Sequence, residues 1–159
     1  MPERIVYAFI DSQNLNLGVI SQGWNLDWRK FRQYLHNKYG VTKALLFIGN
    51  IPGHEGLYRS LRNKGYTVIL KPTTILPNGT VKGNVDAELV LHSMIEYPNY
   101  SKAIIVSGDS DFYCLAEYLM QKNKLLHLMT PNKKYSQLLR RFSGYIVRID
   151  QLRGSLELG

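Results

Sequence analysis

The chain is poor in cysteine and in long apolar runs. Its 159 residues contain one cysteine, Cys114. A single cysteine excludes an internal disulfide and a zinc site built on several cysteines, and no base is recognisable that would activate it as a nucleophile. No apolar stretch approaches the roughly 20 residues that a membrane-spanning helix needs. Residues 1–4 lack the pattern of a signal peptide. We therefore expect a cytoplasmic protein with no contact to a membrane.

Acidic residues are also scarce. The chain has 20 Lys and Arg residues against 12 Asp and Glu residues, a net charge of +8. Such an excess favours a polyanionic partner such as nucleic acid. Four of the acids fall at expected strand ends or at an expected helix start, and these are Asp11, Asp86, Asp109 and Asp111. A basic body with an acidic spot is typical of a metal-dependent enzyme that acts on nucleic acid.

Apolar runs alternate with helical patterns along the whole chain. The runs that we expect to be strands are 5–10, 44–48, 66–70, 103–106, 125–129 and 145–149. Between most of them, apolar residues spaced three and four apart indicate amphipathic helices. This alternation predicts an α/β fold with a mostly parallel sheet and helices on both faces. We expect one domain over residues 1–159, with its core at about 4–150 and a loose tail at 151–159.

Two polar segments interrupt this rhythm. Residues 12–23 are predicted to form a loop above the edge of the sheet, which makes the neighbouring Trp24 and Trp28 candidates for stacking on bases. Residues 71–83 contain the turn-forming sequence Pro-Asn-Gly at 77–79. They are predicted to form a small hairpin or flap.

Two carboxylates follow the expected strand at 103–106. Asp109 and Asp111 lie between that strand and the amphipathic stripe of the next helix. In an open α/β sheet, this strand-to-helix junction borders the crevice where ligands bind. One aspartate would be enough to cap the helix. The second adds repulsion between like charges, which a divalent cation would relieve.

Two further acids are expected near this pair. Asp11 follows the first strand, and the first and fourth strands of a doubly wound sheet can be neighbours near its switch point. Asp86 falls in the first turn of the helix after the flap, where the helix dipole favours a carboxylate whatever its function. Carboxylates suit Mg²⁺ or Mn²⁺, which generate hydroxide and neutralise charge on a phosphodiester. The pattern leaves open whether one metal or two would bind.

Three motifs in this order resemble those of the NYN domain. They are Asp-Ser-Gln-Asn-Leu at 11–15, Lys-Gly-Asn-Val-Asp at 82–86 and Ser-Gly-Asp-Ser-Asp-Phe at 107–112. The chain is most similar to the LabA-like branch of this family, within the PIN-like nuclease superfamily, from residue 4 to about residue 150. The resemblance implies a PIN-like three-layer α/β/α sandwich, a site for Mg²⁺ or Mn²⁺, and RNA as the substrate.

The resemblance also assigns roles by position. The residues that it implies for metal binding and catalysis are Asp11, Asp86, Asp109 and Asp111. It implies substrate contacts at Ser107 and at Asn14, although the spacing of Asn14 equally allows it to orient Asp11 or only to satisfy backbone groups of the loop.

Basic residues complete the expected substrate site. Lys82 on the flap could hold a phosphate near the metal, and Lys133 and Lys134 could follow the backbone of a single-stranded RNA. The chain is therefore predicted to be a metal-dependent ribonuclease that hydrolyses RNA phosphodiester bonds.

One departure from the family pattern favours an alternative. Many relatives carry a further Asp about two turns into the helix that begins near Asp86, whereas this chain has His92 and Ser93 there. The alternative is a catalytically weak RNA- or nucleotide-binding regulatory module that keeps the acidic metal pocket. A homodimer and a monomer are both compatible with the sequence.

Overall fold

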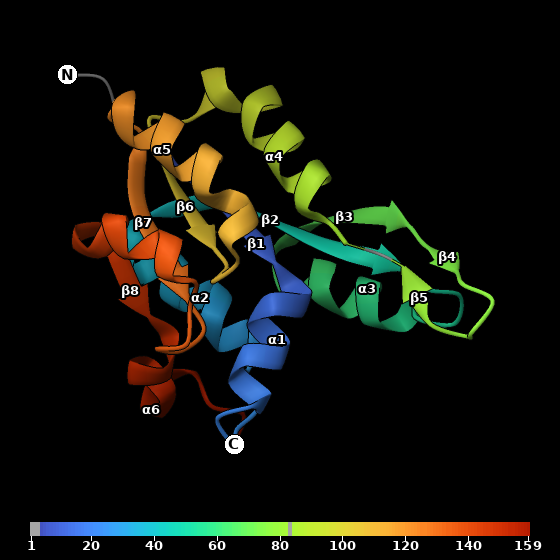
Figure 1. Ribbon diagram of the computed structural model, residues 1–159. Helices are drawn as coiled ribbons and strands as arrows, with labels where there is room; N and C mark the ends of the chain where they lie inside the picture. Colours follow the sequence, from blue (N-terminus) through green and yellow to red (C-terminus); the bar gives the residue numbers. More distant parts are fainter. Residues whose placement is uncertain (1–3, 83) are drawn as a thin grey trace.

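The computed structural model describes residues 4–82 and 84–159 (Figure 1). Its centre is a six-stranded parallel sheet with the order β3-β2-β1-β6-β7-β8. The strands are β1 (Val6–Asp11), β2 (Val41–Asn50), β3 (Tyr66–Pro72), β6 (Lys102–Val106), β7 (Leu125–Thr130) and β8 (Ile146–Arg148). The predicted parallel sheet is confirmed, and β1 and β6 are neighbours as expected.

Helices cover both faces of this sheet (Figure 1). The α-helices are α1 (Ser12–Ile20), α2 (Trp28–Tyr39), α3 (Glu55–Asn63), α4 (Asp86–Ile95), α5 (Tyr113–Gln121) and α6 (Arg153–Leu156). The 3-10 helices are η1 (Tyr97–Asn99), η2 (Ser110–Phe112), η3 (Gln137–Tyr145) and η4 (Ile149–Leu152). The three-layer α/β/α arrangement implied by the resemblance is confirmed. Among the described residues, no helix is long and apolar enough to cross a membrane.

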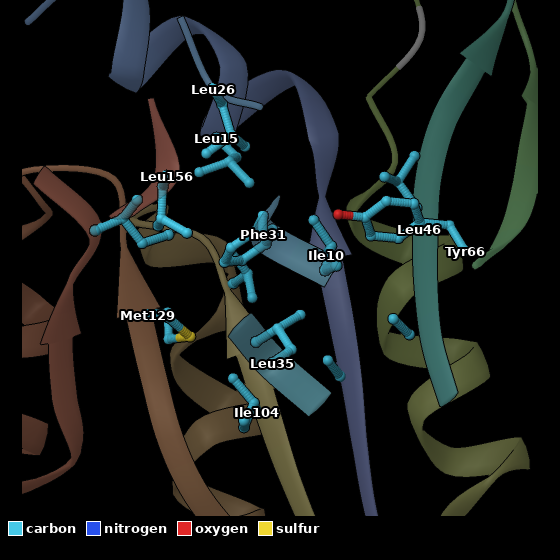
Figure 2. Close-up of a cluster of buried hydrophobic side chains, with 14 of the residues drawn as sticks. Ile10, Leu15, Leu26, Phe31, Leu35, Leu46, Tyr66, Ile104, Met129 and Leu156 are labelled. Carbon is cyan, nitrogen blue, oxygen red and sulfur yellow. The ribbon is translucent and has the colours of Figure 1, made fainter. Parts of the chain in front are cut away.

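The two cores follow from the alternation of side chains along the strands. On β1, Ala8 and Ile10 face the core under α1, α2, α3 and α6, while Phe9 faces the core under α4, α5 and η3. On β6, Ile104 faces the first of these cores and Ile105 faces the second. Figure 2 shows the first of these cores. Because both faces are buried, the central strands are continuous apolar runs, which made them easy to predict.

The segment predicted to be a loop at 12–23 is instead largely helix α1, so this expectation is wrong. Asp11 is the N-cap of the helix, and its Oδ1 accepts a hydrogen bond from the backbone N–H of Asn14 at 3.2 Å. Leu15 and Val19, one turn apart, are fully buried. The polar residues between them conceal this narrow stripe, so tertiary packing and the cap decide the structure.

The tail predicted to be loose is packed against the body. It forms η4 and α6, and Leu156 is fully buried in the first core. A bridge between Leu26 and Glu157 ties its end to the segment before α2. Trp24 is also buried in this core, so it is not available for stacking on a base. A single apolar contact such as Leu156 leaves no periodic signature in the sequence.

The predicted hairpin is confirmed in its described residues. Strands β4 (Thr74–Ile75) and β5 (Val81–Lys82) pair in antiparallel fashion, and the chain turns between them through Gly79 at φ +85°. The hairpin projects beyond the end of the sheet near β3 (Figure 1). It connects β3 to α4 and so leads the chain into Asp86.

A glycine sets how closely α1 approaches the loop after β7. A Cβ atom on Gly18 would lie 2.4 Å from Cβ of Pro131, whereas one on Gly56 of α3 would meet no atom within 4 Å. Gly18→Ala is expected to lower the free energy of unfolding by about 1–3 kcal/mol through overpacking. Gly56→Ala should leave it unchanged or raise it by up to about 1 kcal/mol. Urea unfolding checks both, and equal stability of the two variants would contradict this packing.

Candidate active site

Three aspartates meet at the carboxyl edge of the sheet. Asp11 ends β1, Asp109 follows the neighbouring strand β6, and Asp86 is the first residue of α4. One carboxylate oxygen of each lies within 4.8 Å of the other two. Asp111, also expected here, is exposed and is not part of this group within the described residues. It is a neighbour of Asp86 and helps to raise the pKa of that carboxyl group.

A buried hydroxyl fixes two of the acids. Ser107 is fully buried, and its Oγ donates to Oδ2 of Asp11 at 3.4 Å while it accepts the backbone N–H of Asp109 at 3.1 Å. Ser107 therefore lies behind the acids as a positioning residue, not in the space where a substrate would bind. The substrate contact implied by the resemblance does not fit this buried place.

Asn14 fixes the loop that carries Asp109. Its Oδ1 accepts the backbone N–H of Gly108 at 2.9 Å. The side chain of Asn14 therefore contacts the backbone of the loop after β6, whereas the sequence suggested its own loop after the first strand. Asn14 also borders the open space next to the acids, so its amide group is within reach of a bound molecule.

Helix N-termini converge on the acids. Asp11 caps α1, Asp109 caps η2 by accepting the backbone N–H of Asp111 at 3.0 Å, and Asp86 begins α4. The positive ends of the helix dipoles stabilise negative charge in this position. They offset part of the repulsion between the carboxylates, and they also favour the binding of a phosphate group.

Burial and the neighbouring negative charges alter the acid–base properties of the site. The pKa of Asp86 is raised from 3.8 to about 7 by burial, by the neighbouring carboxyl of Asp111 and by the charges of Asp109 and Asp11. The pKa of Asp11 is also raised, chiefly by burial. In addition, Oδ2 of Asp86 is buried and has no hydrogen-bond partner among the described residues. Such a set of oxygen ligands fits a hard divalent cation, which would partner that oxygen and relieve the repulsion.

A cleft of about 670 Å³ opens over the acids. Polar side chains from four separate segments border it, and those that sequence reasoning missed are Gln13, Ser21, Asn84, Asn132 and Tyr135. Asn84 accepts the backbone N–H of Asp86 at 2.8 Å, and Asn132 donates to the backbone carbonyl of Gly18 at 2.9 Å. Asparagines in loops carry no periodic signal, so only their place after the flap and after β7 could have suggested them.

Of the expected basic side chains that the structure describes, one borders the cleft. Lys134 borders the cleft, while Lys133 is exposed beside it and does not border it. The side chain of Lys82 lies outside the described residues. His92 packs its ring against Phe47, with centroids 5.6 Å apart, and Ser93 is buried and bonded to the backbone of Leu89. Neither of these two residues supplies a carboxylate to the cleft.

Comparison with known proteins identifies the family of this chain. The model of the NYN domain matches residues 6–150. The chain belongs to the NYN domain family. This is a family of metal-dependent nucleases, and Asp11, Asp86 and Asp109 of this member form an acidic group that could hold a divalent ion.

Two relatives share nearly the whole chain. The Low amplitude and bright protein LabA of Synechococcus elongatus is 25% identical over 166 residues, which cover 98% of this chain and 89% of that protein. A crystal structure of a protein of unknown function from Vibrio parahaemolyticus is 26% identical and superimposes with a TM-score of 0.81 over 99% of this chain and 100% of that one. The similarity to the NYN family and to LabA predicted from the motifs is thus confirmed.

The raised pKa of Asp86 makes the stability of the metal-free protein depend on pH. Its unfolded carboxyl releases its proton near pH 3.8 and its folded carboxyl near pH 7, so the folded state binds more protons within this window. Stability contributed by the protonated form is therefore lost as the pH rises through the window. Asp86→Asn removes this loss, and the variant should gain stability over the parent protein between about pH 4 and pH 7.

Urea unfolding in EDTA at several pH values measures this difference. It should be smallest at about pH 4, grow with pH, and stay constant above about pH 7. A difference that does not change with pH would mean that Asp86 titrates normally.

Proposed function

We propose that this protein is a divalent-metal-dependent ribonuclease that hydrolyses phosphodiester bonds of single-stranded RNA in the acidic cleft. The observation that carries the proposal is the meeting of Asp11, Asp86 and Asp109, which leaves a buried oxygen of Asp86 without a partner among the described residues. A binding protein with no metal would gain nothing from this repulsion. Membership of a nuclease family supports the same reaction.

The residues of the cleft have different proposed roles. Asp11 and Asp109 would hold the cation, and Ser107 and Asn14 fix the positions of these two acids. Asp86 and the neighbouring Asp111 either complete the metal site or hold the attacking water. Mg²⁺ or Mn²⁺ bound there would activate water for attack and would neutralise charge on the phosphate.

The approach of the RNA is favoured by basic residues at the rim. Lys134 borders the cleft on the side of the loop after β7, and Lys133 extends the positive surface outward. The wider chain carries a net charge of +8, which attracts a polyanion over longer distances. Phosphates are therefore drawn to the acids, where a cation changes the sign of the local charge.

Asp109→Asn tests the nuclease directly. The variant keeps the size of the side chain and an oxygen that can cap η2, but it removes one charged ligand. It is expected to abolish cleavage of a labelled single-stranded RNA in Mg²⁺ or Mn²⁺ while the fold remains, and to be more stable than the parent protein in EDTA because repulsion is reduced. Gel analysis of the RNA and thermal unfolding measure the two effects.

Asp27→Asn is the matched control. Asp27 caps α2 by accepting the backbone N–H of Lys30 at 3.1 Å, and asparagine caps a helix equally well. It borders neither the cleft nor the acids, so this variant should cleave like the parent protein. If RNA is bound but stays whole with every divalent metal, the protein is an RNA-binding module and the nuclease hypothesis is refuted. If Asp109→Asn cleaves RNA like the parent protein, the proposed active site is refuted.

The basic rim is tested by the salt dependence of RNA binding. Lys133→Ala combined with Lys134→Ala should weaken binding to the same extent for all RNA sequences. It should also reduce the slope of log affinity against log salt by about 0.7 for each phosphate that is no longer neutralised. Lys38→Ala, at the exposed last turn of α2, is the control and should leave the slope unchanged. Fluorescence anisotropy in EDTA avoids cleavage, and an unchanged slope in the double variant would place the RNA elsewhere.

A further inference from the structure

A second pocket lies directly beside the acidic cleft. It has a volume of about 400 Å³, and Gln13 and Val85 border both spaces. These residues flank the site along the chain, because Gln13 is two residues after Asp11 and Val85 immediately precedes Asp86. The volume lies within the range of small-molecule sites. Any molecule in this pocket would therefore lie next to a group bound at the acids.

The walls of the second pocket are mainly apolar. Trp28, at the start of α2, packs its ring edge-on against Tyr66 with centroids 6.0 Å apart. The hydroxyl of Tyr66 also donates to the backbone carbonyl of Trp28 at 2.6 Å, which fixes the position of this residue. Phe47 and Leu61, which also line the pocket, are buried. An immobilised apolar wall binds a flat ligand without a large loss of side-chain entropy.

The rim adds the groups that a heteroaromatic ring requires. His54 is an exposed ring at the start of α3, and Leu57 on the same helix leaves 46% of its surface exposed. Gln13 and Asn16, three residues apart on α1, add two exposed amide groups to the border of the pocket. Aromatic and apolar surfaces for stacking together with amides for hydrogen bonding are how proteins recognise unstacked RNA bases.

We propose that this second pocket binds the base of the nucleotide that adjoins the phosphate held at the acidic cluster. The inference rests on the proposed ribonuclease function, because continuity with the acidic cleft identifies the occupant. A nucleic acid strand that brings a phosphate to Asp11 and Asp86 also brings a base to the residues beside them. The base covers the exposed surface of Leu57, and the amides of Gln13 and Asn16 contact its polar edge.

Nucleoside monophosphates and ribose 5-phosphate test the base pocket in the whole chain with Mg²⁺ present, because the acids alone would repel the phosphate group. Binding is followed by the backbone amide NMR signals. The monophosphates are expected to shift the signals of His54 and Leu57, which ribose 5-phosphate should not do. His54→Ala and Asn16→Ala are each expected to weaken binding of the monophosphates by about fivefold or more, as removal of a side chain that holds a base does.

The chain offers matched controls for both substitutions. His36 and Asn37 are exposed residues near the end of α2, and neither borders the second pocket. His36→Ala and Asn37→Ala should bind the monophosphates like the parent protein. Equal binding of ribose 5-phosphate, shifts confined to the acidic cleft, or unchanged binding by the His54 and Asn16 variants would overturn the base pocket.

The two proposals fail in different ways. If the monophosphates bind this pocket but RNA stays whole with every divalent metal, the base pocket stands and the nuclease is refuted. If RNA is cleaved in a manner that depends on Asp109, while His54→Ala and Asn16→Ala bind the monophosphates unchanged, the nuclease stands and the base pocket is refuted.

Discussion

Repulsion between three carboxylates is the constraint on which the site depends. Asp11, Asp86 and Asp109 bring oxygens within 4.8 Å of one another, and the pKa of Asp86 rises to about 7 as a result of burial and of its acidic neighbours. Like charges separate unless the backbone holds them. Here the backbone does so, because Asp11 and Asp109 follow two strands that are hydrogen-bonded side by side. The buried hydroxyl of Ser107 then joins these two residues directly.

The same arrangement links stability to function. Helix N-termini at α1, η2 and α4 face the acids and reduce the repulsion, but within the described residues they do not provide a partner for the buried oxygen of Asp86. A divalent cation is the chemical group that satisfies all three carboxylates. A site that is destabilising without its ligand and stabilised by it is a common feature of functional centres. The adjoining apolar pocket is lined by residues of α1 and α3, so an apolar surface flanks the acids on this side.

Residue patterns predicted the sheet and the acids better than the surroundings of the acids. Strands buried on both faces are continuous apolar runs, and the switch point of a doubly wound sheet placed Asp11 near Asp109. Helix α1 was missed because only Leu15 and Val19 form its buried stripe and polar residues fill the rest. The ordered tail was missed for a related reason, since Leu156 alone fixes it in the core. Asn84 and Asn132 act through hydrogen bonds to the backbone, which no spacing in the sequence reveals.

Calorimetric titration of the metal-free protein with Mn²⁺ tests the central claim most directly, because it measures the acidic cluster without any assumption about the substrate. The account predicts saturable binding that is lost in Asp109→Asn and kept in Asp27→Asn, with a matching rise in the unfolding temperature when the metal is present. Absence of saturable binding, or equal binding by Asp109→Asn and the parent protein, would contradict the assignment of Asp11, Asp86 and Asp109 as a metal site.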